Sequence, residues 1–231
     1  MLALSPRLQA VLDFCRSLHT SCNVLADIGT DHAHLPIAAV QHEVCKKAIA
    51  CDLHPGPLGI AEKNIRDAGL AGRIEIRLGD GLMPLIPGES DCVVIAGMGG
   101  MRIWGIILEG MEQAQVARRL ILQPQHDTRL LRKNLHKAGY EIEGERLTRE
   151  VVSGKTHFYI VIAARYTGEF QAWSEQEYFL GKFLINNAGE DFKSYLAGEQ
   201  EKISNYISSI KDEAMLQDAR KRLKWLSDLI P

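Results

Sequence analysis

The chain has 231 residues, of which 46% are hydrophobic and 24% are charged, and its formal net charge is −2. This composition excludes collagen-like and disordered chains, and it gives no overall signature of nucleic-acid binding, so that any such binding must come from a local patch. We expect a cytoplasmic protein, because no apolar run is long enough to span a membrane and residues 1–7 lack the features of a signal peptide.

Apolar runs of strand length alternate with helical patterns as far as Tyr166. Continuous apolar strands separated by helices indicate an α/β fold with a mostly parallel sheet that is covered on both faces. The expected strands are Asn23–Ile28, Ala48–Asp52, Ile74–Leu78, Cys92–Ala96, Leu120–Gln123, Tyr140–Leu147 and Phe158–Ala164. The expected helices are Pro36–Val44, Gly56–Ala68, Met101–Ala114 and Asp127–Ala138.

The end of the chain differs from the alternating part. Only residues 148–157 separate the last two expected strands, which predicts a hairpin and an antiparallel final strand at or near the sheet edge. After Gly168 apolar residues recur at helical spacing, with breaks expected at Gly189 and Gly198. We expect two or three amphipathic helices in a coiled-coil-like hairpin, serving either as a packed cap or as an arm that grips a large substrate. The predicted domains are residues 1–166 and 167–231.

The first expected strand ends in an acid and a glycine. Gly29 lets the backbone come close to a ligand at the carboxyl end of the strand, where open α/β sheets bind their ligands. Two carboxylates, Asp27 and Asp31, flank this turn. They favour a cationic or hydroxyl-rich ligand, such as S-adenosylmethionine, over a pyrophosphate.

Acids and glycines also follow the next strands. Asp52 ends the second strand, where a carboxylate can accept hydrogen bonds from both hydroxyls of a ribose. Asp80 lies between two glycines and can accept from an adenine amino group, although each of these acids could instead cap a helix or a turn. The expected cofactor-binding residues are Asp27, Gly29, Thr30, His32, Asp52, Leu53, Gly79, Asp80, Gly81, Ala96 and Gly97.

Three other ligands fit the sequence less well. The first turn lacks the Gly-x-Gly-x-x-Gly of nicotinamide enzymes, and no Lys-Ser or Lys-Thr pair follows Gly97–Gly100, as a phosphate loop requires. His32 and His34 are two residues apart, so they do not share a helix face, and no third ligand cluster accompanies them. The five cysteines form no Cys-x-x-Cys pair. We therefore expect reduced cysteines and no metal.

In combination these motifs resemble the bacterial tRNA (adenine-N1)-methyltransferases of the TrmK type, which modify adenosine 22. The resemblance spans about Leu4 to Tyr166, and the helical tail is similar in kind. Two positions depart from the family pattern: His34 replaces a tyrosine and Gln125 replaces an asparagine. The motifs that carry the resemblance are Asp27–Pro36, Asp52 with Gly56–Leu58, Gly79–Leu82, Ile95–Gly100 and Leu122–Pro124.

The resemblance implies a class I, Rossmann-like methyltransferase fold, S-adenosylmethionine as methyl donor and tRNA as substrate. We expect a monomer with no membrane partner. Adenine N1 already carries a lone pair, so the protein has mainly to position the two reactants and exclude water. Asp27 or Asp31 could favour the sulfonium charge or help to take the N6 proton. The candidate catalytic residues are Asp27, Asp31, Gly97 and Met98.

The substrate side is expected to combine a glycine-lined entry with a basic patch. Small residues at Gly97–Gly100 admit a planar base, and Arg129, Arg132, Lys133 and Lys137 fall near one helical face. The rival interpretations are a methyltransferase that acts on another RNA or a small molecule, and an RNA-binding module with a vestigial cofactor site. The candidate substrate-binding residues are Arg7, Gly99, Gly100, Gln123, Pro124, Gln125, Arg129, Arg132 and Lys133.

Overall fold

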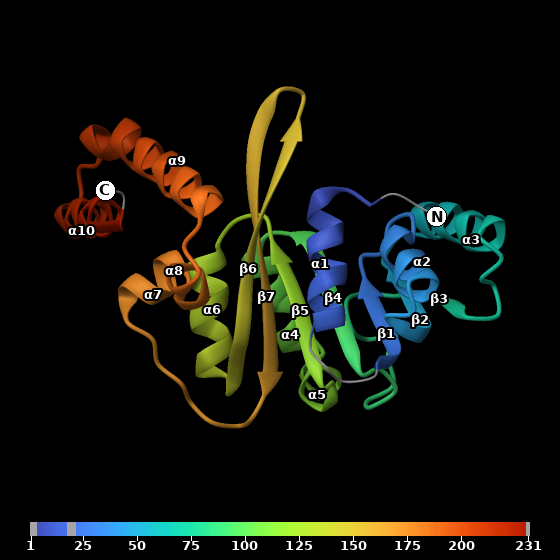
Figure 1. The fold of residues 1–231 in the computed structure, drawn as a ribbon. Coiled ribbons are helices and arrows are strands. Elements are labelled where there is room, and N and C mark those ends of the chain that lie inside the picture. The colour runs from blue at the N-terminus through green and yellow to red at the C-terminus, as the bar shows by residue number, and fades with distance from the viewer. Residues whose placement is uncertain (1–3, 18–21, 230–231) are drawn as a thin grey trace. The chain divides into compact units, whose positions relative to one another are not determined.

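Seven strands form one sheet in the order β3-β2-β1-β4-β5-β7-β6 (Figure 1). Strands β1 to β5 pair in parallel, whereas β7 is antiparallel to both β5 and β6. This confirms the predicted mostly parallel sheet and its antiparallel final strand. The strands are β1 (Cys22–Ile28), β2 (Cys45–Asp52), β3 (Ile74–Leu78), β4 (Cys92–Met98), β5 (Arg119–Pro124), β6 (Tyr140–Val152) and β7 (Lys155–Tyr166).

The computed structural model describes residues 4–17 and 22–229. Residues 1–3, on which part of the signal-peptide prediction depends, lie outside the described residues. The chain divides into two compact units, Met1–Ala172 and Trp173–Pro231.

Helices cover both faces of the sheet in the first unit. Apolar side chains of α1, α2 and α3 share one core with those of β1 and β2, among them Val11, Ile37 and Leu25. Because parallel crossovers are right-handed, the helices that follow β4 and β5 lie on the opposite face, where Ile107 and Leu135 are buried. The helices of this unit are α1 (Pro6–Ser17), α2 (His34–Gln41), α3 (Pro55–Asp67), α4 (Gly100–Glu109), α5 (Met111–Val116) and α6 (Thr128–Lys137).

Two helices differ from the prediction. Helix α1 was not among the expected elements, although it begins with a proline and buries Val11 and Leu12. The single helix expected over Met101–Ala114 is divided at Gly110. A Cβ at Gly110 would lie 2.5 Å from Cβ of Leu82, so close packing there requires a glycine, and glycine favours the end of a helix.

The β6–β7 hairpin is longer than expected. Its pairing runs from Tyr140–Tyr166 out to Val152–Lys155, whereas β5 pairs with β7 only at residues 120–122. The outer part is therefore a two-stranded ribbon that extends beyond the rest of the sheet (Figure 1). The sequence prediction stopped short because residues 148–157 are largely polar, as befits strands that contact solvent on both faces.

The second unit is helical. Helix α7 begins with a capping box made by Ser174 and Glu177. Gly189 precedes α9 as predicted, but Gly198 lies inside that helix rather than at a break. Helices α9 and α10 pack together and bury Leu196, Ile203, Ala219 and Leu226. The helices of this unit are α7 (Glu175–Leu180), α8 (Lys182–Asn186), α9 (Glu190–Tyr206) and α10 (Glu213–Leu229).

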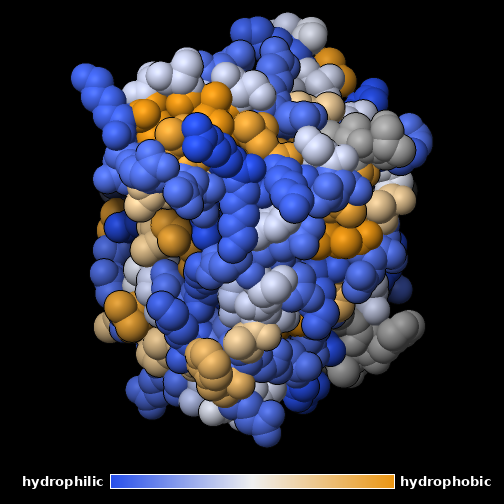
Figure 2. Space-filling model, turned by 90° about the vertical axis from the view of Figure 1, so that its left-hand side faces the viewer, coloured by the Kyte–Doolittle hydropathy of each residue, from blue (hydrophilic) through white to orange (hydrophobic). Residues whose placement is uncertain are grey.

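The surface is largely polar where it can be seen in Figure 2, with hydrophobic residues gathered in separate patches. Among residues 4–17 and 22–229, no helix combines the length and the apolar character needed to cross a membrane.

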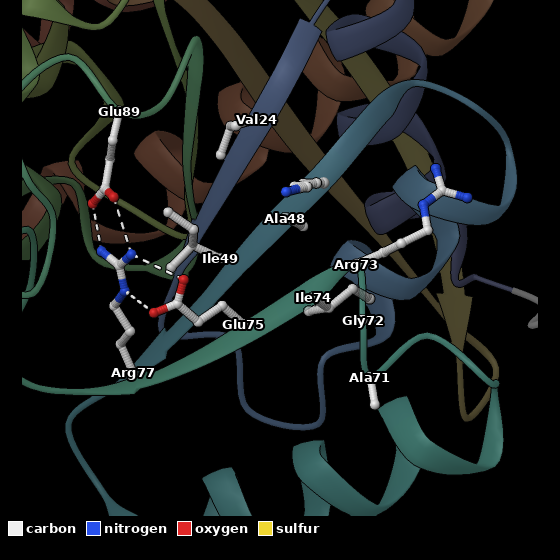
Figure 3. Close-up of a pocket in the computed structure, with 11 residues that line it drawn as sticks. Val24, Ala48, Ile49, Ala71, Gly72, Arg73, Ile74, Glu75, Arg77 and Glu89 are labelled. Carbon is white, nitrogen blue, oxygen red and sulfur yellow. Dashed lines mark hydrogen bonds and ion pairs between the residues drawn. The ribbon is translucent and has the colours of Figure 1, made fainter.

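No helix forms between β3 and β4, where a loop closes part of the sheet instead. Arg77 of β3 holds this loop to the sheet. Its Nε donates to Glu75 of the same strand at 2.8 Å, and its Nη2 donates to Glu89 of the loop at 3.0 Å (Figure 3). Beside this ion-pair network lies a cavity of about 290 Å³, whose walls include Val24 and Ile49. The acids around Arg77 are paired with it, and the other charged residues of the cavity wall are the cations Lys47 and Arg73.

Candidate functional site

A polar cavity of about 220 Å³ lies at the carboxyl edge of the sheet, where β1 and β4 end. Its walls come from α1, from the turn after β1, from the start of α2 and from the end of β4. The structure thus brings together several residues that the sequence analysis selected from separate motifs. The lining residues are Arg7, Leu8, Asp27, Gly29, Thr30, Asp31, His32, His34, Leu35, Ala96 and Gly97.

Asp27 is the buried acid of this cavity, with 5% of its surface exposed. Burial raises the pKa of its carboxyl group to about 6, and nearby Asp52 adds to the rise. The Thr30 hydroxyl, which donates to Asp27 at 2.7 Å, and the Arg7 guanidinium both oppose it. The carboxylate is therefore mostly ionised at neutral pH, although it is poorly hydrated.

The turn after β1 is held by the backbone of β2. The N–H groups of Gly29 and Thr30 both donate to the carbonyl of Cys51, each at 2.9 Å. Gly29 has a φ of +73°, and a Cβ there would lie 2.3 Å from Cε of Met98. Only glycine fits this backbone without strain and without moving Met98, which explains the glycine of the first motif.

Asp52 ends β2 next to this turn. Its carboxylate accepts from the backbone N–H of Asp31 at 3.1 Å and from that of His54 at 3.0 Å. A carboxylate has about four acceptor sites, so two remain for a ligand such as a pair of hydroxyls. Asp52 lies beside the cavity lining rather than in it, and Leu53, which follows it, is exposed.

The end of β3 adjoins the end of β2. The N–H of Gly79 donates to the carbonyl of Asp52 at 3.0 Å. Asp80 is half-exposed and forms an ion pair with Arg102 of α4 at 3.1 Å. The predicted acids therefore occupy adjoining strand ends, and Arg102 is a partner of Asp80 that no local pattern predicts.

The glycine loop after β4 is fixed by a buried amide. Gln123 is fully buried, and its Oε1 accepts from Nη1 of Arg7 at 2.9 Å and from the N–H of Gly97 at 3.1 Å. Its Nε2 donates to the carbonyl of Pro124, which is also buried. Gln123 and Pro124 were expected to contact substrate, and this expectation is corrected: their polar groups are used inside the protein, so they support the site.

The rest of the glycine loop packs against the start of α6. A Cβ at Gly99 would lie 2.5 Å from the His126 ring, and one at Gly100 would lie 2.8 Å from the carbonyl oxygens of His126 and Asp127. The N–H of Gln125 donates to the carbonyl of Met98 at 2.8 Å. The loop is therefore small because it must approach the next loop closely, and Gln125 itself is exposed beside it.

The expected substrate contact of Arg132 on the basic helix α6 is also wrong. Arg132 is completely buried, and its Nε donates to the equally buried Glu145 at 2.6 Å. It cannot reach a phosphate, so its expected role in substrate binding is replaced by a structural ion pair. Arg129 and Lys133 are half-buried and Lys137 is exposed, which leaves a smaller basic surface than the helical spacing predicted.

Sequence reasoning also missed part of the cavity wall. Leu8 belongs to α1, which was not predicted, and Leu35 begins the helix after the first turn. His34 also lines the cavity, and its departure from the family tyrosine was the signal that could have singled it out. In the part of the chain that the structure describes, no group of three or more His, Cys, Asp or Glu residues could hold a metal ion.

Comparisons with known proteins agree with this geometry. A family model described as tRNA (adenine(22)-N(1))-methyltransferase matches residues 25–229. The tRNA (adenine(22)-N(1))-methyltransferase of Bacillus subtilis (strain 168) is 32% identical over 98% of this chain and 94% of its own length.

Two solved structures carry a cofactor. A Streptococcus pneumoniae protein in complex with S-adenosyl-L-methionine is 29% identical, covers 99% of this chain and 100% of its own, and has a TM-score of 0.86. TrmK of M. capricolum in complex with the cofactor product S-adenosyl-homocysteine is 28% identical, with a TM-score of 0.80 over 99% of each chain.

Proposed function

This chain belongs to the family of tRNA (adenine(22)-N(1))-methyltransferases, and we propose how the cavity at the carboxyl edge of its sheet serves that activity. The enzyme transfers a methyl group from S-adenosylmethionine to N1 of adenine 22 in tRNA. The observation that carries the site proposal is the meeting of Asp27, Asp52 and the Gly29 turn at adjoining strand ends.

The residues at these strand ends fit the chemistry of S-adenosylmethionine. When bound, this cofactor supplies a methyl group on a cationic sulfonium. Asp52 has acceptor sites left for the two ribose hydroxyls, and Asp80 can accept from the adenine amino group. Gly29, Thr30 and His32 line the cavity, which has room for the methionine part.

We assign Asp27 an electrostatic role. Its carboxylate is buried, mostly ionised at neutral pH and held in place by the Thr30 hydroxyl. A fixed negative charge in a poorly hydrated site favours a cation strongly. No strong base is needed to activate adenine N1, which already has a lone pair, so the main task of the protein is to position the two reactants.

The substrate base is proposed to enter beside the glycine loop. Gly97 lines the cavity and Met98 follows it, whereas Gly99 and Gly100 pack closely on the loop before α6 and border the entry. Arg7 lies at the border of the cavity, where Gln123 fixes its guanidinium. Exposed and half-buried cations on α6 supply phosphate contacts; these are Arg129, Lys133 and Lys137.

Residues 1–166 are proposed to bind the cofactor without the helical unit, because every strand-end motif precedes Gly168. The helices that follow are proposed to hold the body of the tRNA. We further propose that the enzyme acts as a monomer, and in the cytoplasm because its substrate is found there.

A product analysis tests this function. The enzyme is incubated with labelled S-adenosylmethionine and a tRNA transcript that has adenine at position 22, and the nucleosides are then separated. We expect label in 1-methyladenosine, and none when position 22 carries guanine. Equal labelling of free adenosine, or of the guanine-22 transcript, would contradict the assignment.

A further inference from the structure

The outer part of the β6–β7 hairpin has no evident role in the core. Pairing with β5 ends at Leu122–Ile162, yet β6 and β7 continue to pair as far as Val152–Lys155. A two-stranded ribbon is marginally stable by itself in water. This ribbon extends past the carboxyl ends of the parallel strands, which is the edge that carries the cavity (Figure 1).

Helix α1 braces one face of this ribbon. The Thr148 hydroxyl donates to the carbonyl of Pro6 at 3.4 Å, and the Arg146 guanidinium lies 5.2 Å from the centre of the Phe14 ring. The Arg7 guanidinium lies 5.8 Å from the centre of the Tyr159 ring. Thr148 is paired with Tyr159, so the braced face is the one that carries Tyr159.

The same face continues outward as an aromatic surface. His157 lies two residues from Tyr159 along β7 and therefore on the same side of the strand. The two rings are stacked, with centroids 6.3 Å apart and an interplanar angle of 15°. His157 is exposed.

This aromatic surface joins the cavity through Arg7. The guanidinium that packs on Tyr159 also lines the cavity and donates to Gln123, which in turn holds Gly97. The chain from His157 through Tyr159 and Arg7 thus leads from the outside of the hairpin to the proposed entry of the base.

The charge of the ribbon suits an anionic partner. Residues 146–157 contain three basic side chains and one acid. By the strand register, Arg146 and Lys155 share the face of Tyr159 and His157 with the acid Glu150, which pairs with His157, while Arg149 lies on the opposite face. Exposed aromatic rings next to cations are the surface that binds single-stranded nucleic acid, by stacking on bases while the cations approach phosphates.

We propose that the α1-facing side of the hairpin, through Tyr159 and His157, stacks tRNA nucleotides that neighbour the target adenine. This inference rests on the proposed function, since it assigns a further contact to the same substrate. A base taken out of its stack leaves neighbours without a partner, and aromatic side chains can replace that partner. The hairpin would then help to keep the target adenine extruded.

The test compares variants on the two faces of the hairpin. His157→Ala and Tyr159→Ala remove rings from the braced face, whereas Val151→Ala trims an exposed side chain on the opposite face. Binding of a tRNA transcript is measured at several salt concentrations, with S-adenosylmethionine affinity as a second readout. We expect each ring loss to weaken tRNA binding by roughly 5- to 150-fold, the range for one stacked base.

Three further outcomes of this experiment are expected if the rings stack on bases. His157→Phe and Tyr159→Phe retain a ring and should bind tRNA nearly as well as the wild type. The salt dependence of binding should keep its slope, because no phosphate contact is lost. Affinity for S-adenosylmethionine should be unchanged, which separates stacking from a displaced Arg7.

Unchanged tRNA binding in His157→Ala, or an equal loss in Val151→Ala, would overturn the inference. An equal loss of tRNA affinity in His157→Phe and Tyr159→Phe would also overturn it, because these variants keep a ring. The proposed function fails separately, if the wild-type enzyme leaves adenine 22 unmethylated.

Discussion

The two sides of the cavity are held together by different kinds of contact. On the β1–β3 side, backbone groups join neighbouring strand ends: the N–H of Gly29 donates to Cys51, and that of Gly79 donates to Asp52. On the β4–β6 side, backbone bonds such as that from Gln125 to Met98 are also present, but side chains in addition join distant segments. Arg7 and Gln123 are 116 residues apart in sequence, and the buried pair of Arg132 and Glu145 links α6 to β6.

This difference explains which side could be read from the sequence. A contact made by the backbone at the end of a strand leaves a local pattern of acid and glycine, because only those residue types fit there. A contact between side chains on separate elements leaves no local pattern. Three of the four predictions below compare a change on one side with a change at a matched residue elsewhere, and the fourth compares one variant with the wild type across pH.

The largest effect is expected from the buried ion pair. Arg132→Met leaves the Glu145 carboxylate buried without this partner, which should lower the free energy of unfolding by about 3–5 kcal/mol. Lys133→Met, at the next position, should change stability little but reduce the salt slope of tRNA binding by about 1. Urea unfolding and binding at several salt concentrations measure both. If Arg132→Met is as stable as the wild type and the salt slope of its tRNA binding is reduced, Arg132 contacts a phosphate and the structural role is wrong.

The error at Arg132 shows why a helical face cannot be assigned by charge alone. The spacing of α6 grouped Arg132 with the other cations, but its buried residues are Leu131, Arg132, Leu135 and His136. The acid that permits this burial, Glu145, lies on another element. Helix α1 was missed in a similar way, because the role of its apolar residues depends on the sheet against which they pack.

The strand ends were predicted well for the opposite reason. The bounds of β3 agree with the prediction, and Asp27 and Asp52 lie at the ends of β1 and β2 as expected. Alternation of apolar runs and turn residues is a local property, so the order of strands and helices could be derived from it. The outer hairpin could not, because a ribbon exposed on both faces has no apolar alternation.

A smaller effect is expected at the glycine loop. Gly100→Ala places a Cβ 2.8 Å from two backbone carbonyl oxygens, which cannot move aside cheaply, so we expect a loss of about 1–3 kcal/mol in stability together with most of the activity. Gly105→Ala, in the same helix, meets nothing within 4 Å and should instead stabilise the protein by about 0.5–1 kcal/mol. Thermal unfolding and methyl transfer measure both. Equal behaviour of the two variants would show that the close approach at Gly100 is unimportant.

The raised pKa of Asp27 can be tested by measuring the stability of Asp27→Asn and the wild type as a function of pH. The folded-state pKa of Asp27, about 6, is above its ordinary value of 3.8, so the folded state takes up a proton more readily than the unfolded state. That stabilisation is present at low pH and is lost as pH rises through about 6. Asp27→Asn should therefore be about 3 kcal/mol more stable than the wild type at pH 8 and should lose this advantage below pH 4, while binding S-adenosylmethionine more weakly. A stability difference that does not vary with pH would contradict the raised pKa.

The most direct test of the account is a calorimetric comparison of two acids that hold backbone groups at opposite ends of the sheet. Asp52 accepts from Asp31 and His54 beside the cavity, and Asp91 accepts from Asn23 and Val24 at the start of β1. Replacing either acid with alanine removes two such hydrogen bonds, but only Asp52→Ala also removes the proposed contact with the cofactor. We predict that Asp52→Ala weakens binding of S-adenosylmethionine by about 1–3 kcal/mol while Asp91→Ala binds it as the wild type does. Wild-type affinity in a folded Asp52→Ala variant, or an equal loss in both variants, would contradict the claim that the strand-end carboxylates hold the cofactor.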